Sequence, residues 1–468
     1  MTKSIPHTDR SLTNNVAAVL AALFFVLPFA SEAQERLDSP RSRPLTLHDC
    51  IAIALGESPA LEASRYDVLS AAQEVRALQG IALPQLTGTA GYELFSGSPT
   101  TKFSVVNLGE SSGVALTSRN LVGLGAVETY SARLRYPLFK DGSILGLNNA
   151  PAIAEKKAKK QALAWTVNLK REDVIYRITD EFVLTVSARN RTGLVDRRVT
   201  LLEQSVAITQ EELKQGQKLP IDLKVAKDQL SGAQNLAKLL RQQAVAGSLE
   251  LSRSLGLPSS SKLALSNILP DPPDPPPTAE QLLGAALNRH PSLEVQRAMI
   301  EEAKQNYRLE RFRLYPSVSL DGSAIYIDDF SPANASIFTG AITVSVPIFD
   351  FGAQLATARS KLIKYKAEEA RLFSVADDVT YEVLKAYESI YVLSHFILSL
   401  QAEISKDERD VQVIESQRQQ GIAPPLTAIE KELHLIAKQD DLEGVEARRL
   451  TRYAFLQKAA GGSWKWIP

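Results

Sequence analysis

Side chains that could act as nucleophiles, metal ligands or acid–base pairs are scattered along this sequence and form no motif. The only cysteine is Cys50, so no intramolecular disulfide is possible. The sequence contains neither a P-loop nor a nucleophile elbow. The histidines, none of them at metal-ligand spacing, are His7, His48, His290, His395 and His434. The sequence therefore predicts a protein that is not an enzyme and that holds no cofactor and no metal.

The charge balance argues against a nucleic-acid partner. The chain has 53 Lys and Arg and 53 Asp and Glu, which gives a formal net charge of zero at pH 7. Acidic residues lie among Lys and Arg on predicted helical faces, as is typical of solvated coiled-coil flanks. With no basic patch and no RNA or DNA module, nothing in the sequence would attract a phosphate backbone.

The first 33 residues are organised like a secretory signal peptide. Lys3 and Arg10 precede an apolar run, Val16 to Ala30, and Ser31-Glu-Ala33 places small residues where signal peptidase cleaves. A run of this length is too short to span a bilayer as a helix, and the other interpretation is a short buried helix. Beyond Ala33 we find no apolar stretch near 18 residues. The mature chain is therefore predicted to be exported and to have no transmembrane helix.

The part of the sequence beyond the signal peptide contains an internal duplication. Residues 54–84 return as residues 286–316 at a constant offset, with ten identical positions among 31 where unrelated sequence would give roughly two. The identical positions of the first copy are Ala54, Leu55, Pro59, Leu61, Glu62, Arg65, Ala71, Gln73, Arg76 and Pro84. A repeat this long describes one molecule made of two similar halves.

The duplication divides the chain into five segments. They are a signal peptide (1–33), a first structural repeat (34–269), a Pro-rich linker (270–277), a second structural repeat (278–460) and a C-terminal tail (461–468). The linker reads PDPPDPPP, which cannot form helix or central strand and is predicted to be a stiff connector in polyproline conformation.

Each repeat is predicted to contain a helix, two strands, a very long helix, a tight turn and a second long helix. The first helices are predicted over about 46–83 and 278–315, each followed by a proline. Residues 353–420 contain neither glycine nor proline, and as one helix they would extend about 100 Å at 1.5 Å per residue. The counterpart, 152–215, is interrupted only by Gly193.

Heptad spacing near the turns predicts two antiparallel coiled-coil hairpins. In the first repeat the apolar heptad positions lie on both sides of Gly216 in the sequence, and in the second repeat they lie on both sides of Gly421. Glycine and proline are expected at the two tips. The candidate tip residues are Gly216, Pro220, Gly421, Pro424 and Pro425.

The predicted strands alternate between apolar and polar residues. Near residue 133, Tyr130 and Leu134 share one face and Ser131 and Arg133 the other, and residues 338–348 alternate in the same way. Such alternation also fits a half-buried soluble sheet. Strand length, the signal peptide and the strand count favour a membrane sheet, because four strands cannot close in lipid whereas three copies give twelve. A Gly/Ser/Thr-rich stretch from about residue 96 to 123 is read as an external loop.

At this point the chain resembles the outer membrane efflux protein family, the TolC-like channels. The likeness rests on LTLHDCIAIALGESPAL with its echo in the second half, on the two hairpin tips, and on the segments that end each second strand. Those segments contain Pro137, Phe139 and Gly142 in the first half and Pro347, Phe349 and Gly352 in the second. Each motif is common, but their order and duplication together are specific.

The resemblance implies a mixed α and β membrane protein built from a duplicated protomer. Three protomers would form a 12-stranded β-barrel in the outer membrane of a Gram-negative bacterium, continuous with a 12-helix periplasmic α-barrel. Such a homotrimer would be the passive exit duct of a tripartite efflux or type I secretion system. Its partners would be outer-membrane lipid, a periplasmic adaptor (membrane fusion) protein at the hairpin tips, and an inner-membrane transporter that supplies the energy.

The resemblance also implies where the periplasmic aperture would lie. In this family an acidic residue six positions after the second tip glycine, and another three further on, narrow the tunnel entrance. Here those positions are Thr427 and Glu430, and the equivalent of the earlier one in the first half is Asp222. Rings of three carboxylates would favour cations. The alternative is that these side chains are solvated charges on an exposed hairpin face.

Two other classes of protein share parts of this pattern. A periplasmic adaptor or another structural coiled-coil protein of an export complex would also have a signal peptide and hairpins, but it would need a β-rich clamp domain and a single hairpin. A secreted enzyme would need a catalytic constellation, and the sequence contains none that we recognise. The duplicated strand pairs with tyrosines along one face favour the channel.

Overall fold

The structure is a computed structural model of the chain and describes residues 44–97, 104–107, 113–116, 123–145, 150–258, 263–273, 278–328 and 335–466. The predicted signal peptide lies outside these residues, as do parts of the predicted linker and of the loop between residues 96 and 123. All the elements named below belong to one unit, Pro44–Pro468.

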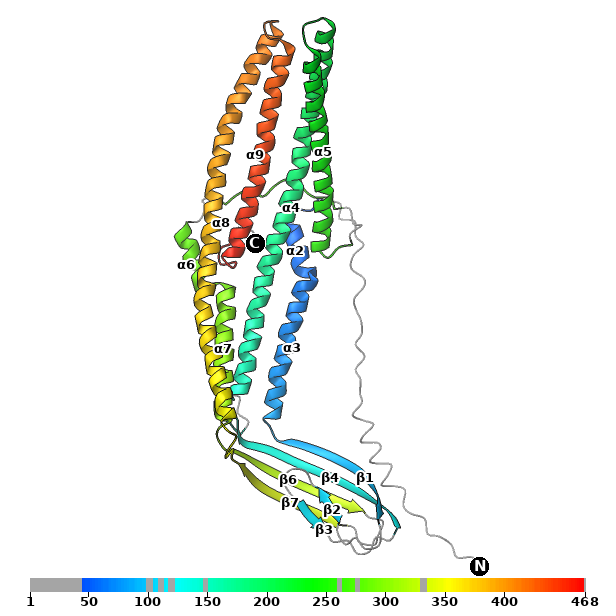
Figure 1. Cartoon of the computed structure of the whole chain (residues 1–468), viewed down its shortest axis with the longest axis vertical. Coiled ribbons are helices and arrows are strands. Elements are labelled where there is room, and N and C mark those ends of the chain that lie inside the picture. Colours follow the sequence, from blue (N-terminus) through cyan, green and yellow to red (C-terminus); the bar gives the residue numbers. More distant parts are fainter. Residues whose placement is uncertain are drawn as a thin grey trace, which may run out of the picture. The chain divides into compact units, whose positions relative to one another are not determined.

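The helix that opens each repeat is broken in two, which corrects the prediction of single helices over 46–83 and 278–315. The first divides into α2 (Leu47–Glu57) and α3 (Pro59–Ile81), the second into α6 (Ala279–Arg289) and α7 (Pro291–Phe312) (Figure 1). Each break falls before a proline, because proline donates no amide hydrogen and disfavours helical backbone in the residue that precedes it. The residues before the two prolines, Ser58 and His290, are accordingly extended.

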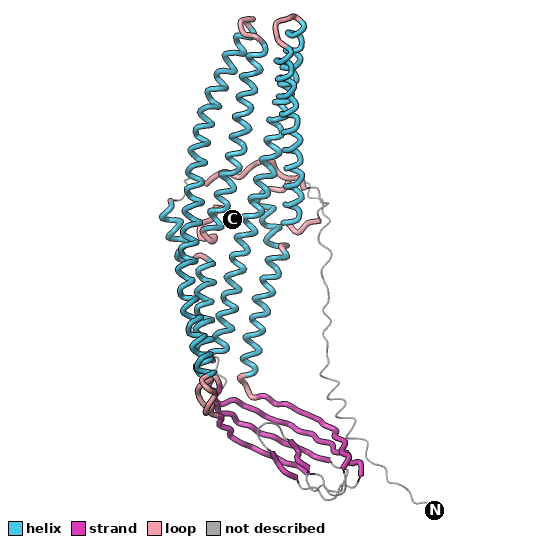
Figure 2. Tube along the Cα trace, in the orientation of Figure 1, coloured by secondary structure: helices cyan, strands magenta, loops and turns pink. Residues whose placement is uncertain are grey.

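The long helices form two hairpins, as predicted. The first hairpin pairs α4 (Pro151–Lys214) with α5 (Pro220–Ser254), and the second pairs α8 (Ala353–Gln419) with α9 (Pro425–Ala459). Helix α4 also packs against α3, α7 and α9, whereas α8 also packs against α6 and α7. The helices therefore form a wall in which α3 and α5 lie at one edge and α8 at the other. The tips lie at the end of this unit opposite the sheet (Figure 2).

Four antiparallel strands form the sheet in the order β1-β4-β6-β7, with the short β5 (Ser143–Ile144) paired to the end of β4. The strands are β1 (Gln85–Gly97), β4 (Gly123–Lys140), β6 (Ser317–Asp328) and β7 (Ala335–Ser345). The alternation predicted to continue to Ile348 stops at Ser345, so β7 is shorter than expected. A separate two-stranded ladder, β2 (Ser104–Asn107) with β3 (Gly113–Leu116), lies within the predicted external loop.

The two faces of the sheet differ in chemistry. On one face Thr89 bonds Ser131 and Ser323 bonds Thr339, each at 2.6 Å between hydroxyl oxygens, and Arg135 donates to Asp321 at 2.9 Å. The other face is apolar and exposed. Its members include Leu86, Tyr92, Tyr130, Leu134, Leu320, Tyr326, Phe338, Ile342 and Val344. An exposed apolar face of this extent is not compatible with water alone.

Both strand pairs end in the same turn. Asp141 and Gly142 have φ of 53° and 82°, and Phe351 and Gly352 have φ of 54° and 81°. At Gly142 a Cβ would lie 2.5 Å from the Phe312 ring, so this position excludes any other residue. The motif glycines therefore reverse the chain from the strands into the long helices.

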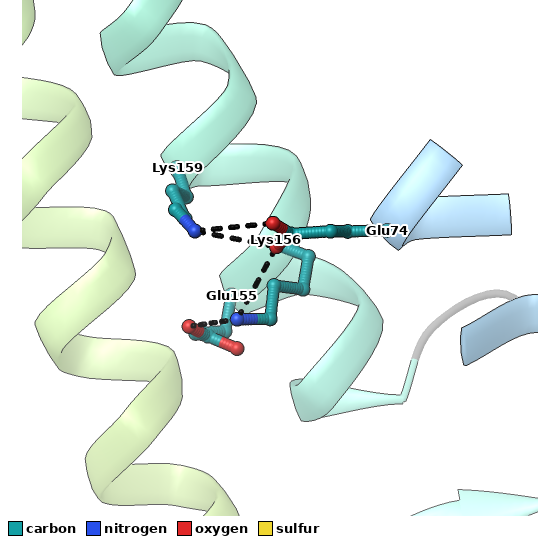
Figure 3. A network of polar contacts seen from close by, with 4 residues as sticks. All are labelled: Glu74, Glu155, Lys156 and Lys159. Atoms are coloured by element: carbon teal, nitrogen blue, oxygen red, sulfur yellow. Dashed lines mark hydrogen bonds and ion pairs between the residues drawn. The ribbon is translucent and has the colours of Figure 1, made fainter. Parts of the chain in front are cut away.

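Near the sheet, charged side chains tie α3 to α4. Glu74 of α3 accepts hydrogen bonds from Lys159 at 3.2 and 3.4 Å and pairs with Lys156 at 3.6 Å, and Lys156 also meets Glu155 (Figure 3). The two lysines hold the pKa of Glu74 below its ordinary value, chiefly through the hydrogen bond from Lys159. This network links the edge helix α3 to α4.

Short elements cover one face of the helical wall halfway along it; we call them the belt, made of α2, α6, residues 263–273 and residues 460–466. Helix α2 packs on Phe182 of α4, and α6 packs on Val383 of α8. Trp466 donates its indole N–H to the carbonyl of Asp271 at 2.8 Å, which joins the C-terminal residues to the segment between the repeats. The belt therefore provides much of the buried core.

One helix among the described residues meets the length and composition of a membrane span. An 18-residue window of α8 has a mean hydropathy of 1.2, with 28% of the window buried. The prediction that no such stretch follows residue 33 is therefore wrong. Helix α8 is apolar on two sides, because Ile397 and Leu400 pack on Val445 of α9 while a second stripe remains exposed. That stripe includes Leu384, Tyr391 and Leu398, spaced by seven residues.

Candidate functional site: the two hairpin tips

Both hairpin tips are built by the same backbone motif. Gly216 has φ of 74°, its amide bonds the carbonyl of Leu213 at 3.1 Å, and the amide of Gln217 bonds that of Glu212 at 2.8 Å. In the second tip Gly421 has φ of 75° and bonds Arg418 at 3.0 Å, and the next amide bonds Gln417 at 2.9 Å. This pair of bonds is the Schellman arrangement, which requires a left-handed residue at the helix end. The glycines are needed for backbone conformation, because no atom lies within 4 Å of a Cβ built at either position.

The return helices also start in the same way. Pro220 and Pro425 occupy the first helical position, where the missing amide hydrogen costs nothing. The residues before them, Leu219 and Pro424, are the N-caps. Asp222 and Thr427 are therefore equivalent, since each is the third residue of its helix.

Asp222 and Thr427 differ in what they bond. The Asp222 carboxylate accepts a hydrogen bond from the Leu219 amide at 2.9 Å. Pro424 has no amide hydrogen to offer, so an acidic side chain at position 427 would find no such partner. The amide of Thr427 bonds the carbonyl of Pro424 at 3.2 Å. Asp222 thus stabilises the start of α5 and also places a negative charge at the positive end of the helix.

Asp222 and Glu430 do not lie on one hairpin. Asp222 is half-buried on α5, Glu430 is exposed in the second turn of α9, and α4 packs against both helices. The two acidic side chains are therefore carried by different hairpins. Any ring of carboxylates would need other copies.

Apolar side chains are exposed at both tips. Leu219 is 64% exposed and Ile422 is 69% exposed. Ile221 and Val225 extend the same surface along α5. With the exposed Gly216, Pro220, Gly421, Pro424 and Pro425 they form the tip surface. Exposed apolar side chains thus gather at the ends of both hairpins.

A seam of polar contacts joins the two hairpins below the tips. The guanidinium of Arg191 on α4 donates two hydrogen bonds to the Asp440 carboxylate on α9, at 2.7 and 3.0 Å. Asn190 donates to Glu443 at 2.7 Å, and Arg197 pairs with Glu432. The hydrogen bonds to Asp440 raise the pKa of Arg191 above its ordinary value. We call this set of α4–α9 contacts the seam.

The second hairpin has its own ion pairs between helices. Asp407 lies 2.6 Å from His434, and Glu403 lies 2.6 Å from Lys438. The third pair is Asp410 with Lys431, at 3.5 Å. These pairs join α8 to α9 along the second hairpin.

Sequence patterns alone did not reveal the seam. Its residues are charged side chains among many others on α4 and α9, 249 positions apart in the case of Arg191 and Asp440. One signal was present in the sequence, a glycine within α9. A Cβ built at this residue, Gly444, would lie 3.7 Å from the guanidinium carbon of Arg191. A helical glycine often marks a close approach by another element.

Comparison with known proteins agrees with this geometry. Residues 282–462 match the family model described as outer membrane efflux protein. No curated protein matches the sequence significantly. The resemblance to this family inferred from the sequence is thereby confirmed for the second repeat.

Solved structures extend the likeness to most of the chain. The outer membrane protein VceC of Vibrio cholerae is similar with a TM-score of 0.71 and 16% identity, covering 89% of this chain and 96% of that one. The CmeC outer membrane channel of Campylobacter jejuni is similar with a TM-score of 0.73 and 12% identity, covering 90% of this chain and 86% of that one. The open state of the MtrE outer membrane channel of Neisseria gonorrhoeae is similar with a TM-score of 0.72 and 14% identity, covering 90% of this chain and 89% of that one. At these identities the shared property is the fold, which includes both repeats.

Proposed function

We propose that this chain, which carries the outer membrane efflux protein pattern over residues 282–462, is one protomer of a trimeric outer-membrane exit duct. The duct passively conducts substrate that a periplasmic adaptor and an inner-membrane transporter deliver. The observation that carries the proposal is the four-stranded sheet with one exposed apolar face, joined to a wall of long helices whose two edges are unpaired.

The strands suit a bilayer. Their lengths are 13, 18, 12 and 11 residues, and a tilted membrane strand needs about ten. The apolar face would meet lipid and the hydroxyl-rich face would line water. Because β1 and β7 are open edges, which lipid does not tolerate, the sheet must pair with further strands. Three copies give twelve strands and a closed barrel.

The helical wall has matching edges. On α8 the exposed stripe of Leu384, Tyr391 and Leu398 is on the side away from α9. At the other edge Tyr66 of α3 and Leu239 of α5 are 60% and 53% exposed. A head-to-tail contact between unlike edges closes into a ring, which would cover both apolar edges at once. The same rotation would pair β7 with β1 of the next protomer.

The tip surface is the proposed adaptor contact, and the seam is the proposed gate. Three copies of Asp222 and of Glu430 around one axis would narrow the periplasmic entrance and favour cations. Separation of α8–α9 from α4 along the seam would widen it. The chain itself offers no site for an energy source among the residues described, so the transporter would supply the energy.

Reconstitution into planar bilayers tests the proposal. The purified protein should migrate as a trimer that heat dissociates, and it should conduct ions across the bilayer. Charge reversal at the seam, with Arg191→Asp, should raise the conductance, and the compensating Asp440→Arg should lower it again. A monomeric protein without conductance would overturn the channel proposal.

A further inference from the structure

A groove lies in the helical wall between α4 and α8, with α9 as its floor. Its volume is about 600 Å³, within the range of sites for small molecules. Helix α4 contributes Tyr176, Asp180 and Leu184, α8 contributes Lys385, Glu388, Ser389, Val392 and Leu393, and α9 contributes Arg448, Thr451 and Arg452. A second cavity of about 420 Å³ shares Lys385 and Arg452 with it and continues toward the sheet.

The groove is on the face of the wall opposite the belt. At 100° per residue, Asp180 and Leu184 point away from Phe182 and Ile178, the α4 residues on which the belt packs. On α9, Arg448 and Arg452 similarly point away from Leu450 and its neighbours in the buried core. The groove and the belt therefore occupy different sides of the same three helices.

This side would be the interior of the duct, an argument that rests on the function proposed above. Twelve helices spaced by about 10 Å enclose a ring about 38 Å across, with about 28 Å free inside. Three copies of the belt would fill that space, because each brings two helices about 10 Å in diameter and further chain. An open duct needs the belt outside, and the groove then faces the lumen.

The groove combines cations with an apolar wall. In the groove itself three cations, Lys385, Arg448 and Arg452, outnumber two carboxylates, Asp180 and Glu388. The adjoining cavity carries two further carboxylates, so the excess of positive charge is confined to the groove around Arg448. Burial raises the pKa of Asp180, while the nearby Arg452 acts in the opposite direction. The apolar wall consists of Tyr176, Leu184, Val392 and Leu393.

An aromatic side chain on the sheet side of the groove contacts one of these cations, Lys385. The ammonium of Lys385 lies 5.4 Å from the ring centroid of Tyr381. Tyr176 packs edge-on against Phe455, with ring centroids 5.7 Å apart, and this contact joins the two cavities. A ligand with an anionic group and a flat apolar body would therefore meet guanidinium groups and aromatic faces together.

We propose that this groove is a binding site for amphipathic organic anions inside the duct wall. The anionic group lies against Arg448, Arg452 and Lys385, and the apolar body lies on Leu184, Val392 and Tyr176. Each chain carries one such site, so a trimer presents three around the lumen. Substrates of this class make contact with the wall halfway along the tunnel.

A matched pair of fluorescent probes tests this site directly. The first probe is 8-anilinonaphthalene-1-sulfonate, and the second is N-phenyl-1-naphthylamine, which has the same ring system without the sulfonate. The protein is held in nanodiscs of zwitterionic lipid, and empty nanodiscs give the background. We expect the double variant Arg448→Gln, Arg452→Gln to weaken sulfonate-probe binding about tenfold and to leave the neutral probe unchanged.

Two further variants make the result decisive. Lys227→Gln with Lys238→Gln removes two exposed cations of α5 and should leave both probes unaffected. Val392→Glu adds a carboxylate at the exposed rim and should weaken the sulfonate probe without removing any arginine. Equal sulfonate-probe affinity in all proteins, or parallel loss of the neutral probe, would overturn the site. Conductance measured on the same variants is independent of probe binding, so failure of the channel proposal is distinguishable.

Discussion

The Asp222 carboxylate accepts a hydrogen bond from the backbone amide of Leu219 at 2.9 Å, a contact that the second hairpin tip cannot make. The equivalent amide does not exist in the second tip, because its N-cap is Pro424. An aspartate at position 427 would therefore find no N-cap amide to bond, and threonine at this position gives up no such hydrogen bond. The two tips therefore differ in two linked ways: the N-cap is proline only in the second tip, and the third helical residue is charged only in the first.

Substitutions at 222 separate the capping role from the charge. Asp222→Ala should destabilise the start of α5 by about 0.5–1 kcal/mol, because the Leu219 amide loses its acceptor. Asp222→Asn keeps an acceptor and should cost less, while it removes the charge. Hydrogen exchange at the first turn of α5 reports the cap, and cation selectivity in bilayers reports the charge. Thr427→Ala is the control and should change neither; equal exchange in Asp222→Ala and the wild type would contradict the capping role.

Alanine at the tip glycines tests backbone conformation alone. Gly216→Ala and Gly421→Ala should each lower the free energy of unfolding by about 1 kcal/mol, because φ is near 75° at both positions. The loss would come from the backbone alone, since no neighbouring atom would obstruct the added methyl group. Gly193→Ala offers a matched control within α4, where the methyl group is equally free and the backbone is helical. It should stabilise by about 0.5–1 kcal/mol. Thermal unfolding of the three variants should order them in this way, and a neutral Gly216→Ala would be inconsistent with the turn described.

The sequence predicted the repeated architecture because its signals are local. A long run without glycine or proline specifies α8, a run interrupted only by Gly193 specifies α4, and alternation specifies the strands. The breaks at Pro59 and Pro291 were missed, since a proline at a first helical position looks the same as one inside a longer pattern. The seam and the groove were missed for another reason: both depend on which faces of distant helices meet, and charged side chains occur all along those helices.

The seam pair Arg191 and Asp440 should show measurable coupling. The side chains are 29% and 13% exposed, so solvent screens the pair only in part. A double-mutant cycle with Arg191→Ala and Asp440→Ala should give a coupling energy of about 1 kcal/mol in thermal or chemical unfolding. Each single variant should also raise bilayer conductance if the seam restrains the tips. Additive effects of the two substitutions would show that the pair does not act as a unit.

Neighbouring residues of β7 test the orientation of the sheet. Phe338 is 81% exposed on the apolar face, and Thr339 bonds Ser323 on the polar face. Phe338→Arg should cost up to about 2–4 kcal/mol in a bilayer and reduce the amount of assembled protein in membranes. Thr339→Arg should be tolerated, because that face would line water in the proposed barrel. Equal assembly of the two variants would exclude the assigned faces.

His290 should make the start of α7 sensitive to pH. Its Nδ1 accepts the Ser292 amide at 3.1 Å, and its ring also bonds the backbone of Lys458 and Ala459, so it links the helix start to the C-terminal end of α9. Burial lowers the pKa of His290, although the backbone bonds act in the opposite direction. Because the folded state favours the neutral ring, its contribution to stability is present above the ordinary histidine pKa and is lost as pH falls through the lowered value. As pH falls below the ordinary histidine pKa, the unfolding temperature should therefore drop by more in the wild type than in His290→Asn, since asparagine caps a helix at every pH. The exposed His395, changed to asparagine, should keep the wild-type pH dependence, and a His290→Asn profile parallel to the wild type would contradict this role.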